Sequence, residues 1–347
     1  MTLPPKVSVV MPVKNEILAL PRLLQSLLDQ DFDSFEIIVA DGESTDGTRE
    51  FVLHLAESSR VPVLLVDNVK IRSGPGRNAG LRRASGDFIV FLDGHCMLPS
   101  RTMLRDTVAL FNETGADCLC RPQPLIAPAR SATGEIIANV RASTLGHGRD
   151  SLIYNMSFSG FVDPASSGAS YRREVFSVLA PYDEAFDACE DVEFNTRLRK
   201  RGMKAYTDPR VAVYYEPRST LRGLAKQMSN YGRGRVRLAL KHPDSMSLAQ
   251  AVPLVITVLL AATVLSLPFH TLIRTTLLSL TACYLLLVLA ASMQLARKHS
   301  LRYLWRAPLV YFTIHIGLGV GILKEMLSHR MSLHLRRLFN RRPEVCS

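Results

Sequence analysis

The stretch FEIIVADGESTDGT, residues 35–48, joins a strand to a helix. Residues 35–40 form a mostly apolar run of the length of a buried strand. Asp41 and Gly42 end this run with turn-forming residues, and a helical pattern begins at Thr48. A strand that ends in a polar turn and continues into a helix is the repeating unit of α/β folds.

The same unit recurs on both sides of this stretch. Three further apolar runs have strand length: residues 7–11, 61–66 and 87–92. The segments between them carry apolar residues at helical spacing: 18–28, 48–57, 78–84 and 100–111. Alternating buried strands and helices predict an α/β fold with a mostly parallel sheet, covered on both faces. A last helix is predicted over residues 190–202, with Gly202 as its C-terminal cap.

Acidic residues follow several of these runs. Glu16 comes after the first run, Asp41 after the second, and Asp93 with His95 after the fourth. Taken singly, such acids are typical of turns and helix caps, as are Asp46 and the pair Glu190-Asp191. Because ligands bind beyond the carboxyl ends of parallel strands, their joint placement favours one shared site.

The residue types at this edge suit a divalent cation and a nucleotide diphosphate. Carboxylates supply the hard oxygen ligands that Mg²⁺ and Mn²⁺ prefer. The imidazole of His95 is compatible with Mn²⁺ and less typical of Mg²⁺. The stretch GPGRNAG, residues 74–80, departs from the dinucleotide-binding fingerprint because its third glycine comes one residue late. We interpret it as a tight turn that opens a helix and leaves Arg72 and Arg77 available to a base or phosphate.

The C-terminal third has a different composition. The net charge is +11, of which +9 lies in residues 241–347. Two runs without charged residues, 245–273 and 275–296, exceed the roughly 20 apolar residues that cross a bilayer. We predict membrane spans at about 248–269 and 275–296. Positive charge beside such runs, without a nucleic-acid-binding motif, indicates a membrane rather than a nucleic acid as partner.

A third uncharged segment, residues 307–323, is marginal for a span. The loop between the first two spans carries only Arg274, whereas the next loop is strongly basic, which places the globular domain in the cytoplasm. A third span would put the basic tail, residues 328–347, outside. We therefore favour a re-entrant or interfacial segment. The expected organisation is a globular domain over 1–218, an amphipathic surface helix within 219–244 and a membrane region over 245–327.

Five motifs, in order and covering about residues 5–215, resemble family 2 glycosyltransferases with the GT-A fold, which has a Rossmann-like nucleotide-sugar-binding domain. They are PVKNE (12–16), ADGESTDGT (40–48), RNAGLRRASGDFIVFLDGH (77–95), SSGASYRREVF (166–176) and EDVEFNTRLRKRG (190–202). Within this family, DGH in place of the commoner DxD resembles the ExoA-type transferases of succinoglycan assembly. The tract over residues 227–235, followed by apolar spans, has the same resemblance.

The resemblance implies a role for each matching residue. The nucleotide-sugar site would comprise Pro12, Glu16, Asp41, Arg72, Arg77 and Asp93. Asp93 and His95 would hold the divalent cation, Mn²⁺ or Mg²⁺. Gly168, Ala169 and Ser170 would shape the sugar or acceptor pocket. Asp191 would be the general base, supported by Glu190, and no covalent nucleophile is expected.

The implied activity is transfer of a single sugar, glucose from UDP-glucose, to a polyprenyl-diphosphate-linked saccharide in exopolysaccharide or cell-surface polysaccharide synthesis. The enzyme would be inverting and would sit in a bacterial-type inner membrane. Processive synthases of this family carry a Q/RxxRW motif, but here no Trp follows Gln227. Two alternatives stay open: a polyprenyl-phosphate sugar synthase of the same fold, and a catalytically silent membrane scaffold.

Overall fold

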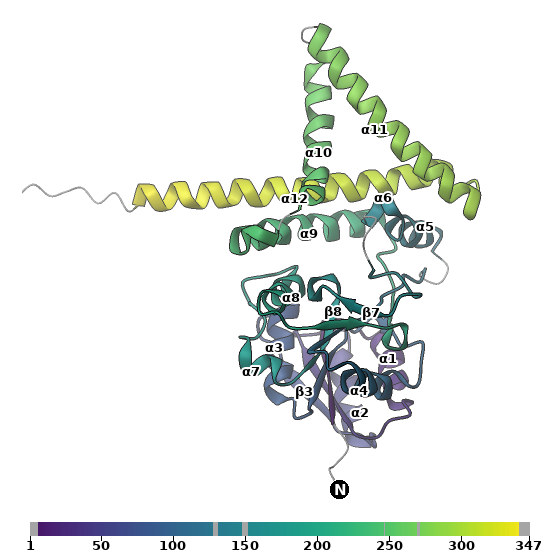
Figure 1. Ribbon diagram of the computed structural model, residues 1–347, viewed down its shortest axis with the longest axis vertical. Helices are drawn as coiled ribbons and strands as arrows, with labels where there is room; N and C mark the ends of the chain where they lie inside the picture. The colour runs from purple at the N-terminus through teal and green to yellow at the C-terminus, as the bar shows by residue number, and fades with distance from the viewer. Residues whose placement is uncertain (1–5, 128–130, 148–151, 246, 269–270, 340–347) are drawn as a thin grey trace, which may run out of the picture. The chain divides into compact units, whose positions relative to one another are not determined.

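The computed structural model describes residues 6–127, 131–147, 152–245, 247–268 and 271–339. It contains two compact units (Figure 1). The first comprises residues 1–131 and 141–217, and the second residues 132–140 and 218–347. The division at Pro217 lies next to the boundary expected at 218. The second unit joins the surface-helix and membrane segments and also takes in the helix α5 (Ala132–Arg141), which the sequence did not indicate.

An eight-stranded sheet forms the centre of the first unit, in the order β3-β2-β1-β4-β8-β6-β9-β7. The first four strands are β1 (Val7–Val13), β2 (Phe35–Asp41), β3 (Val63–Asp67) and β4 (Phe88–Phe91). They pair in parallel, as predicted. The others are β6 (Cys118–Cys120), β7 (Gly160–Val162), β8 (Gly168–Arg172) and β9 (Ala205–Thr207). Because β8 is antiparallel to both β4 and β6, the complete sheet is mixed. Two short strands, β5 (Cys96–Met97) and β10 (Tyr214–Tyr215), pair separately.

Helices cover both faces of this sheet, which confirms the α/β prediction. Alternate residues of β1 enter opposite cores: Val9 and Met11 belong to one cluster, and Val10 belongs to the other. The first core includes α1 (Leu20–Leu28), α2 (Thr48–Ser58) and α4 (Met103–Thr114). The second includes α3 (Ser73–Arg83), α7 (Val175–Val178) and α8 (Glu190–Lys200). A short helix, α6, spans Thr144–His147.

Two local predictions are corrected. Strand β1 does not end before Pro12 but continues to Val13, because beyond Val10 it pairs only with β2 and needs no further donor on its other side. The stretch 74–80 is not a tight turn, since it lies inside α3. A Cβ added at Gly76 would come within 2.8 Å of Pro12 Cβ, so this glycine lets the helix lie close against the sheet.

A buried carboxylate joins the strands at the edge opposite the expected site. Glu36 Oε1 accepts hydrogen bonds of 2.7 Å from Ser8 Oγ, Ser85 N and Ser85 Oγ. Burial opposes ionisation of Glu36, but these donors, aided by Lys6, hold its pKa below the usual value of 4.5. Ionised Glu36 therefore stabilises the folded state.

We expect Glu36→Gln to lower the free energy of unfolding by about 1–3 kcal/mol at pH 7. Because the folded pKa is depressed, the stabilisation is complete above about pH 4.5 and is lost as the pH falls through the folded pKa. Denaturant unfolding of the full chain in detergent, followed by near-ultraviolet circular dichroism, measures the difference. The exposed Glu57→Gln is the control. A difference that stays constant from pH 7 to pH 3.5 would contradict this assignment.

The second unit contains α9 (Leu221–Lys241), α10 (Leu248–Ser266), α11 (Thr271–Lys298) and α12 (Tyr303–Phe339). Helices α9 and α12 lie side by side, and the α10–α11 hairpin projects away from them (Figure 1). Three glycines allow this packing: a Cβ added at Gly317 or Gly321 would strike α9, and one at Gly319 would strike α10. Helix α5 joins the unit through Glu135, which pairs with Arg302 and accepts a hydrogen bond from Tyr303.

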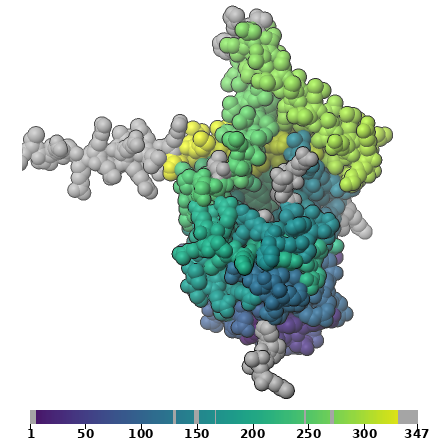
Figure 2. All heavy atoms as spheres, in the orientation of Figure 1, coloured from purple at the N-terminus to yellow at the C-terminus, as the bar shows by residue number. Residues whose placement is uncertain are grey.

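Among the described residues, three helices are long and apolar enough to cross a membrane: Leu248–Ser266, Leu272–Lys298 and Tyr303–His329. Residues 307–323, for which a re-entrant or interfacial form was expected, lie within the continuous helix α12, which contains no reversal. In the most apolar stretches of α10 and α11, only 11% and 17% of the residues are buried, against 44% in α12. Figure 2 shows the hairpin, in green, uncovered over much of its length. Residues 340–347 of the basic tail lie outside the described residues.

Candidate active site

The loops that follow β1 and β2 bind each other at the carboxyl edge of the sheet. Asn15 N donates to Ser44 Oγ at 2.8 Å, and Glu16 N donates to Thr48 Oγ1 at 2.9 Å. In return, Thr45 N donates to Asn15 Oδ1 at 2.8 Å. These bonds place the polar residues after the first two strands beside each other, as their positions in the sequence predicted.

Glu16 lies beside His95 of the predicted cation motif. His95 Nδ1 is 3.0 Å from Glu16 Oε1, and the imidazole ring contacts the ring of Tyr215 edge-on with centroids 5.1 Å apart. A Cβ added at Gly94 would lie 3.2 Å from Glu16 Cγ, so the loops after β1 and β4 meet closely. Glu16, predicted for the nucleotide pocket, therefore orients the imidazole in this structure.

Arg77 links two other predicted acids, Asp93 and Glu190. Its Nη1 is 2.6 Å from Glu190 Oε1, and its Nη2 is 3.3 Å from Asp93 Oδ1. The guanidinium also lies over the ring of Tyr182, 5.4 Å from the centroid. Helix α3, the loop after β4 and the start of α8 thus meet at the Arg77 guanidinium.

The charges in this cluster shift each other's protonation. Burial raises the pKa of Glu190, with Asp191 adding to the rise and Arg77 opposing it. Burial would also raise the pKa of Asp93, but Arg77, His95 and Arg121 hold it below its usual value. For Arg77, the two carboxylates outweigh burial and raise the pKa further. The cluster therefore holds Asp93 ionised and Arg77 charged.

Asp191 differs from its neighbour Glu190. The Glu190 side chain is buried against Arg77, whereas Asp191 is exposed at the first turn of α8 and its Oδ1 accepts a hydrogen bond from Val192 N at 2.8 Å. Cys189, with φ of 62°, turns the chain into the helix. One acid of the pair thus fixes the cluster, and the other presents a carboxylate to solvent beside it.

A separate cavity of about 300 Å³ lies at the ends of β2 and β3. Asp41, Arg49, Asp67 and Asn68 are among the residues that line it. Asp41 is 2% exposed and accepts from Ser44 N, and Arg49 lies 3.6 Å from it. Among the described residues, Asp41 Oδ1 and Asn68 Oδ1 are buried acceptors without a donor. Two unpaired acceptors beside a cavity suit a ligand that brings N–H or O–H groups, such as a nucleotide base or ribose.

The remaining predicted residues lie around these groups. Arg72 precedes α3 with an exposed side chain, and its carbonyl accepts from Asn68 Nδ2 at 3.0 Å. Gly168, Ala169 and Ser170 belong to β8. A Cβ at Gly168 would come within 2.8 Å of Asn195 and Cys118, so this glycine lets α8 pack against the sheet. That contact gives Gly168 a packing role, and a role in a sugar pocket stays a prediction.

The described residues contain no group of three or more His, Cys, Asp and Glu side chains arranged to hold a metal ion. Asp93 and His95 supply two ligands at most. Mg²⁺ and Mn²⁺ sites in phosphate-transferring enzymes commonly complete their coordination with substrate phosphates and water. The donor set therefore fits a cation that binds together with a diphosphate, rather than a complete protein cage.

Comparison with known proteins identifies the family. Residues 8–179 match the model described as "Glycosyl transferase family 2". Over 255 residues the chain is 31% identical to "Succinoglycan biosynthesis protein ExoA" of Rhizobium meliloti, an alignment that covers 72% of this chain and 74% of that protein. The chain belongs to glycosyltransferase family 2. Its predicted family and its resemblance to the succinoglycan protein are confirmed.

Two further similarities concern the fold and a shorter segment. The solved structure of the mannosyltransferase PcManGT from Pyrobaculum calidifontis, in complex with GDP-Man and Mn²⁺, superposes with a TM-score of 0.59 at 21% identity, covering 94% of this chain and 88% of that one. This family 2 chain therefore has a GT-A-like fold. An 87-residue segment, 25% of this chain and 34% of the relative, is 38% identical to "UDP-Glc:alpha-D-GlcNAc-diphosphoundecaprenol beta-1,3-glucosyltransferase WfgD" of Escherichia coli.

Several residues around the candidate site were not predicted. Asp67 ends the third strand and Asn68 follows it, so the rule that selected Asp41 and Asp93 could also have found them. Arg121 is buried after β6, where its Nη1 donates to the carbonyl of Phe91 at 2.7 Å. No local pattern marks Arg121, because β6 has only three residues. Cys96 is buried, and burial raises the pKa of its thiol to about 12, as suits a packing residue rather than a nucleophile.

Proposed function

We propose that this chain is a membrane-anchored, inverting glycosyltransferase that transfers one sugar, glucose from UDP-glucose, to a lipid-linked saccharide acceptor. The observation that carries this proposal is the arrangement of Arg77, Asp93 and Glu190, with exposed Asp191 beside them. Such a site offers the ionised Asp93 carboxylate as a cation ligand near the exposed carboxylate of Asp191. The names of the relatives, one in succinoglycan biosynthesis and one acting on a diphosphoundecaprenol saccharide, support this substrate class.

In the proposed reaction, the Asp191 carboxylate takes the proton of an acceptor hydroxyl as that oxygen attacks the anomeric carbon. The bond between this carbon and the donor diphosphate breaks, and UDP leaves from the opposite side. A divalent cation on Asp93 and His95 would neutralise charge on the departing diphosphate. Asp41 and Asn68 would accept hydrogen bonds from the base or ribose, and the Arg77–Glu190 pair would hold Asp93 in place.

The second unit supports a membrane location. The apolar surfaces of α10 and α11 are mostly uncovered, so we propose that this hairpin enters the bilayer. Helix α12 lies against α9, which carries arginines and lysines along its length. Each Arg or Lys side chain at the centre of a bilayer costs about 2.5–3.5 kcal/mol. Helices α9 and α12 would therefore lie together at the cytoplasmic interface of a bacterial-type inner membrane.

Washed membranes that contain the full chain test this function. They would be incubated with radiolabelled UDP-glucose, UDP-galactose and UDP-N-acetylglucosamine, with the natural lipid-linked acceptors present. The expected product is an extended lipid-linked saccharide labelled from UDP-glucose. A single sugar on a polyprenyl monophosphate would instead show a polyprenyl-phosphate sugar synthase. If no UDP-sugar is consumed in the presence of Mn²⁺ or of Mg²⁺, the chain is not a transferase for these donors.

A further inference from the structure

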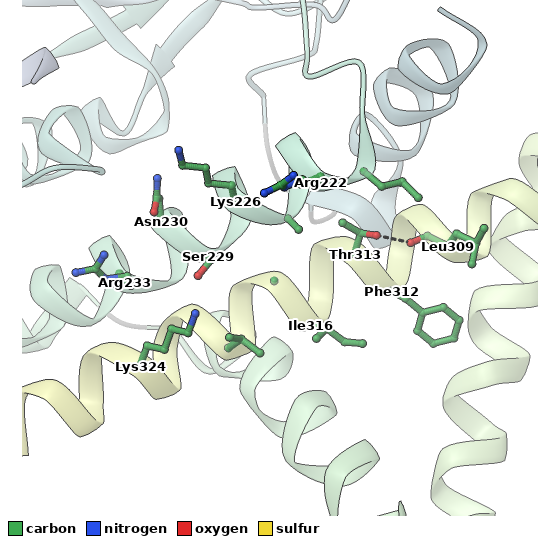
Figure 3. Close-up of a pocket in the computed structure, with 14 residues that line it drawn as sticks. Arg222, Lys226, Ser229, Asn230, Arg233, Leu309, Phe312, Thr313, Ile316 and Lys324 are labelled. Atoms are coloured by element: carbon green, nitrogen blue, oxygen red, sulfur yellow. Dashed lines mark hydrogen bonds between the residues drawn. The ribbon is translucent and has the colours of Figure 1, made fainter.

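A cavity lies wholly within the second unit. It is a groove of about 830 Å³ between α9 and α12, lined by fourteen residues (Figure 3). On α9 the lining residues follow helical spacing through Arg222, Lys226 and Arg233, and on α12 they run from Leu309 to Lys324. One face of each helix therefore forms one wall of the groove.

The groove is strongly cationic. Four basic residues line it, Arg222, Lys226, Arg233 and Lys324, and none of its described lining residues is acidic. Arg233 shares the Glu325 carboxylate with Arg237, at 3.0 and 2.7 Å, so this one acid faces two guanidinium groups. The side chains of Arg222, Lys226 and Lys324 are exposed and make no hydrogen bond or ion pair with any described residue. Three uncompensated charges thus face one cavity.

The same groove has an apolar edge. Leu309, Phe312, Ile316 and Val320 of α12 contribute to it, and Leu309 is 54% exposed. In Figure 3 the charged groups of Lys226 and Arg233 lie along one edge of the groove, and the side chains of Phe312 and Ile316 lie along the other. A ligand that fills this groove needs a compact anionic group joined directly to a hydrocarbon chain.

We propose that this groove binds the isoprenoid-diphosphate end of the lipid-linked acceptor. A diphosphate carries more negative charge than the single phosphodiester of a membrane phospholipid. It therefore matches the basic side chains of the groove better. A saccharide would need several carboxylate or amide acceptors, whereas the described lining residues include no acid and a single amide, Asn230. The apolar edge belongs to the unit whose hairpin exposes apolar surface, so a hydrocarbon chain could pass from the groove into lipid.

This inference rests on the proposed function and names the part of the acceptor that the second unit recognises. The head group would accept charge-assisted hydrogen bonds from Arg222, Lys226 and Lys324. The first isoprene units would pack on Phe312 and Ile316. The close packing of α9 on α12 at Gly232, Gly317 and Gly321 keeps the two walls in register.

A direct binding measurement tests the groove assignment without any sugar transfer. The full chain in lipid nanodiscs would be titrated with fluorescent farnesyl diphosphate, with inorganic diphosphate and phosphatidylglycerol vesicles as competitors. We expect Lys226→Gln and Lys324→Gln each to weaken binding of farnesyl diphosphate about tenfold. Phe312→Ala should weaken the binding of farnesyl diphosphate but leave the binding of inorganic diphosphate unchanged. Arg235→Gln is the matched control, because residue 235 lies on the opposite face of α9 from residue 226 and does not line the groove.

The outcomes separate this inference from the proposed function. Unchanged binding in both lysine variants, or equal displacement by phosphatidylglycerol vesicles, would overturn the groove assignment. In the membrane transfer assay, the lysine variants should raise KM for the lipid acceptor about tenfold and leave KM for the UDP-sugar unchanged. If the native chain glycosylates lipid but these variants keep the native acceptor KM, the groove assignment fails and the function stands. If the native chain binds farnesyl diphosphate through the groove but forms no glycolipid, the groove stands and the function fails.

Discussion

The Asp191→Asn variant should transfer sugar about 10²–10⁴ times more slowly than the native chain, while its affinity for UDP stays within about twofold. Asparagine has nearly the same shape as aspartate but cannot take a proton from the acceptor hydroxyl. The Asp191 side chain is exposed and makes one local hydrogen bond, to Val192 N, so its loss should not disturb the fold. The effect should therefore fall on turnover rather than on donor binding.

Three variants of the same region separate the base from its surroundings. Asp187→Asn, an exposed acid four residues upstream, should keep native turnover. Glu190→Gln should lose affinity for the donor as well as turnover, because it breaks the 2.6 Å pair with Arg77. Steady-state kinetics with a saturating lipid acceptor, together with calorimetric titration of UDP, would measure both quantities. Native turnover in Asp191→Asn would mean that another group acts as the base.

The fold of the first unit could be predicted where the evidence is local. Strands β1 to β4 are apolar runs of four to seven residues, each bounded by polar or turn-forming residues. Their parallel order follows from the helices between them. Strands β6, β7 and β9 have three residues each, and β6 pairs with β9 across more than 80 residues of sequence. Such short strands leave no detectable period, and only the tertiary fold selects their partners.

The glycines of residues 74–80 show a second limit of predicting secondary structure from the sequence. Several glycines and a proline in seven residues normally indicate a turn. Here they lie in α3, because Pro75 is tolerated near a helix start and Gly76 faces Pro12 and Asn68 at a distance that admits no side chain. The same composition can therefore break a helix or let it approach a sheet, and only the neighbouring strand decides between the two.

The candidate site was predictable as a set of acids but not as a network. The position of Asp41 and Asp93 at the ends of the second and fourth strands is a property of the sequence. The pairing of Arg77 with Asp93 and Glu190, 16 and 113 residues away, is not. Arg77 was predicted for a base or phosphate, yet in the structure it neutralises the predicted cation ligand.

The Asp93→Ala variant should lose the metal-dependent part of UDP binding, a weakening of at least about 10–100-fold. Asp93 is the carboxylate of the expected cation pair, and its pKa is held low by Arg77, His95 and Arg121, so it is ionised at neutral pH. Calorimetric titration of UDP into the full chain, with Mn²⁺, with Mg²⁺ and with a chelator, measures the effect. In the chelator, the variant and the native chain should bind UDP with similar affinity.

The pairing with Arg77 predicts how the variants differ from one another. Asp93→Ala leaves Arg77 with Glu190 as its remaining acidic partner, so the fold should persist and only the cation response should vanish. His95→Asn keeps the carboxylate but removes the imidazole, so it should reduce the preference for Mn²⁺ over Mg²⁺ more than it reduces UDP affinity in Mg²⁺. Asp87→Asn, an exposed acid before β4, should behave as the native chain. If Asp93→Ala keeps its full response to Mn²⁺, the cation lies elsewhere, and the Arg77–Asp93 pair is then a structural contact rather than a ligand held ready for the donor.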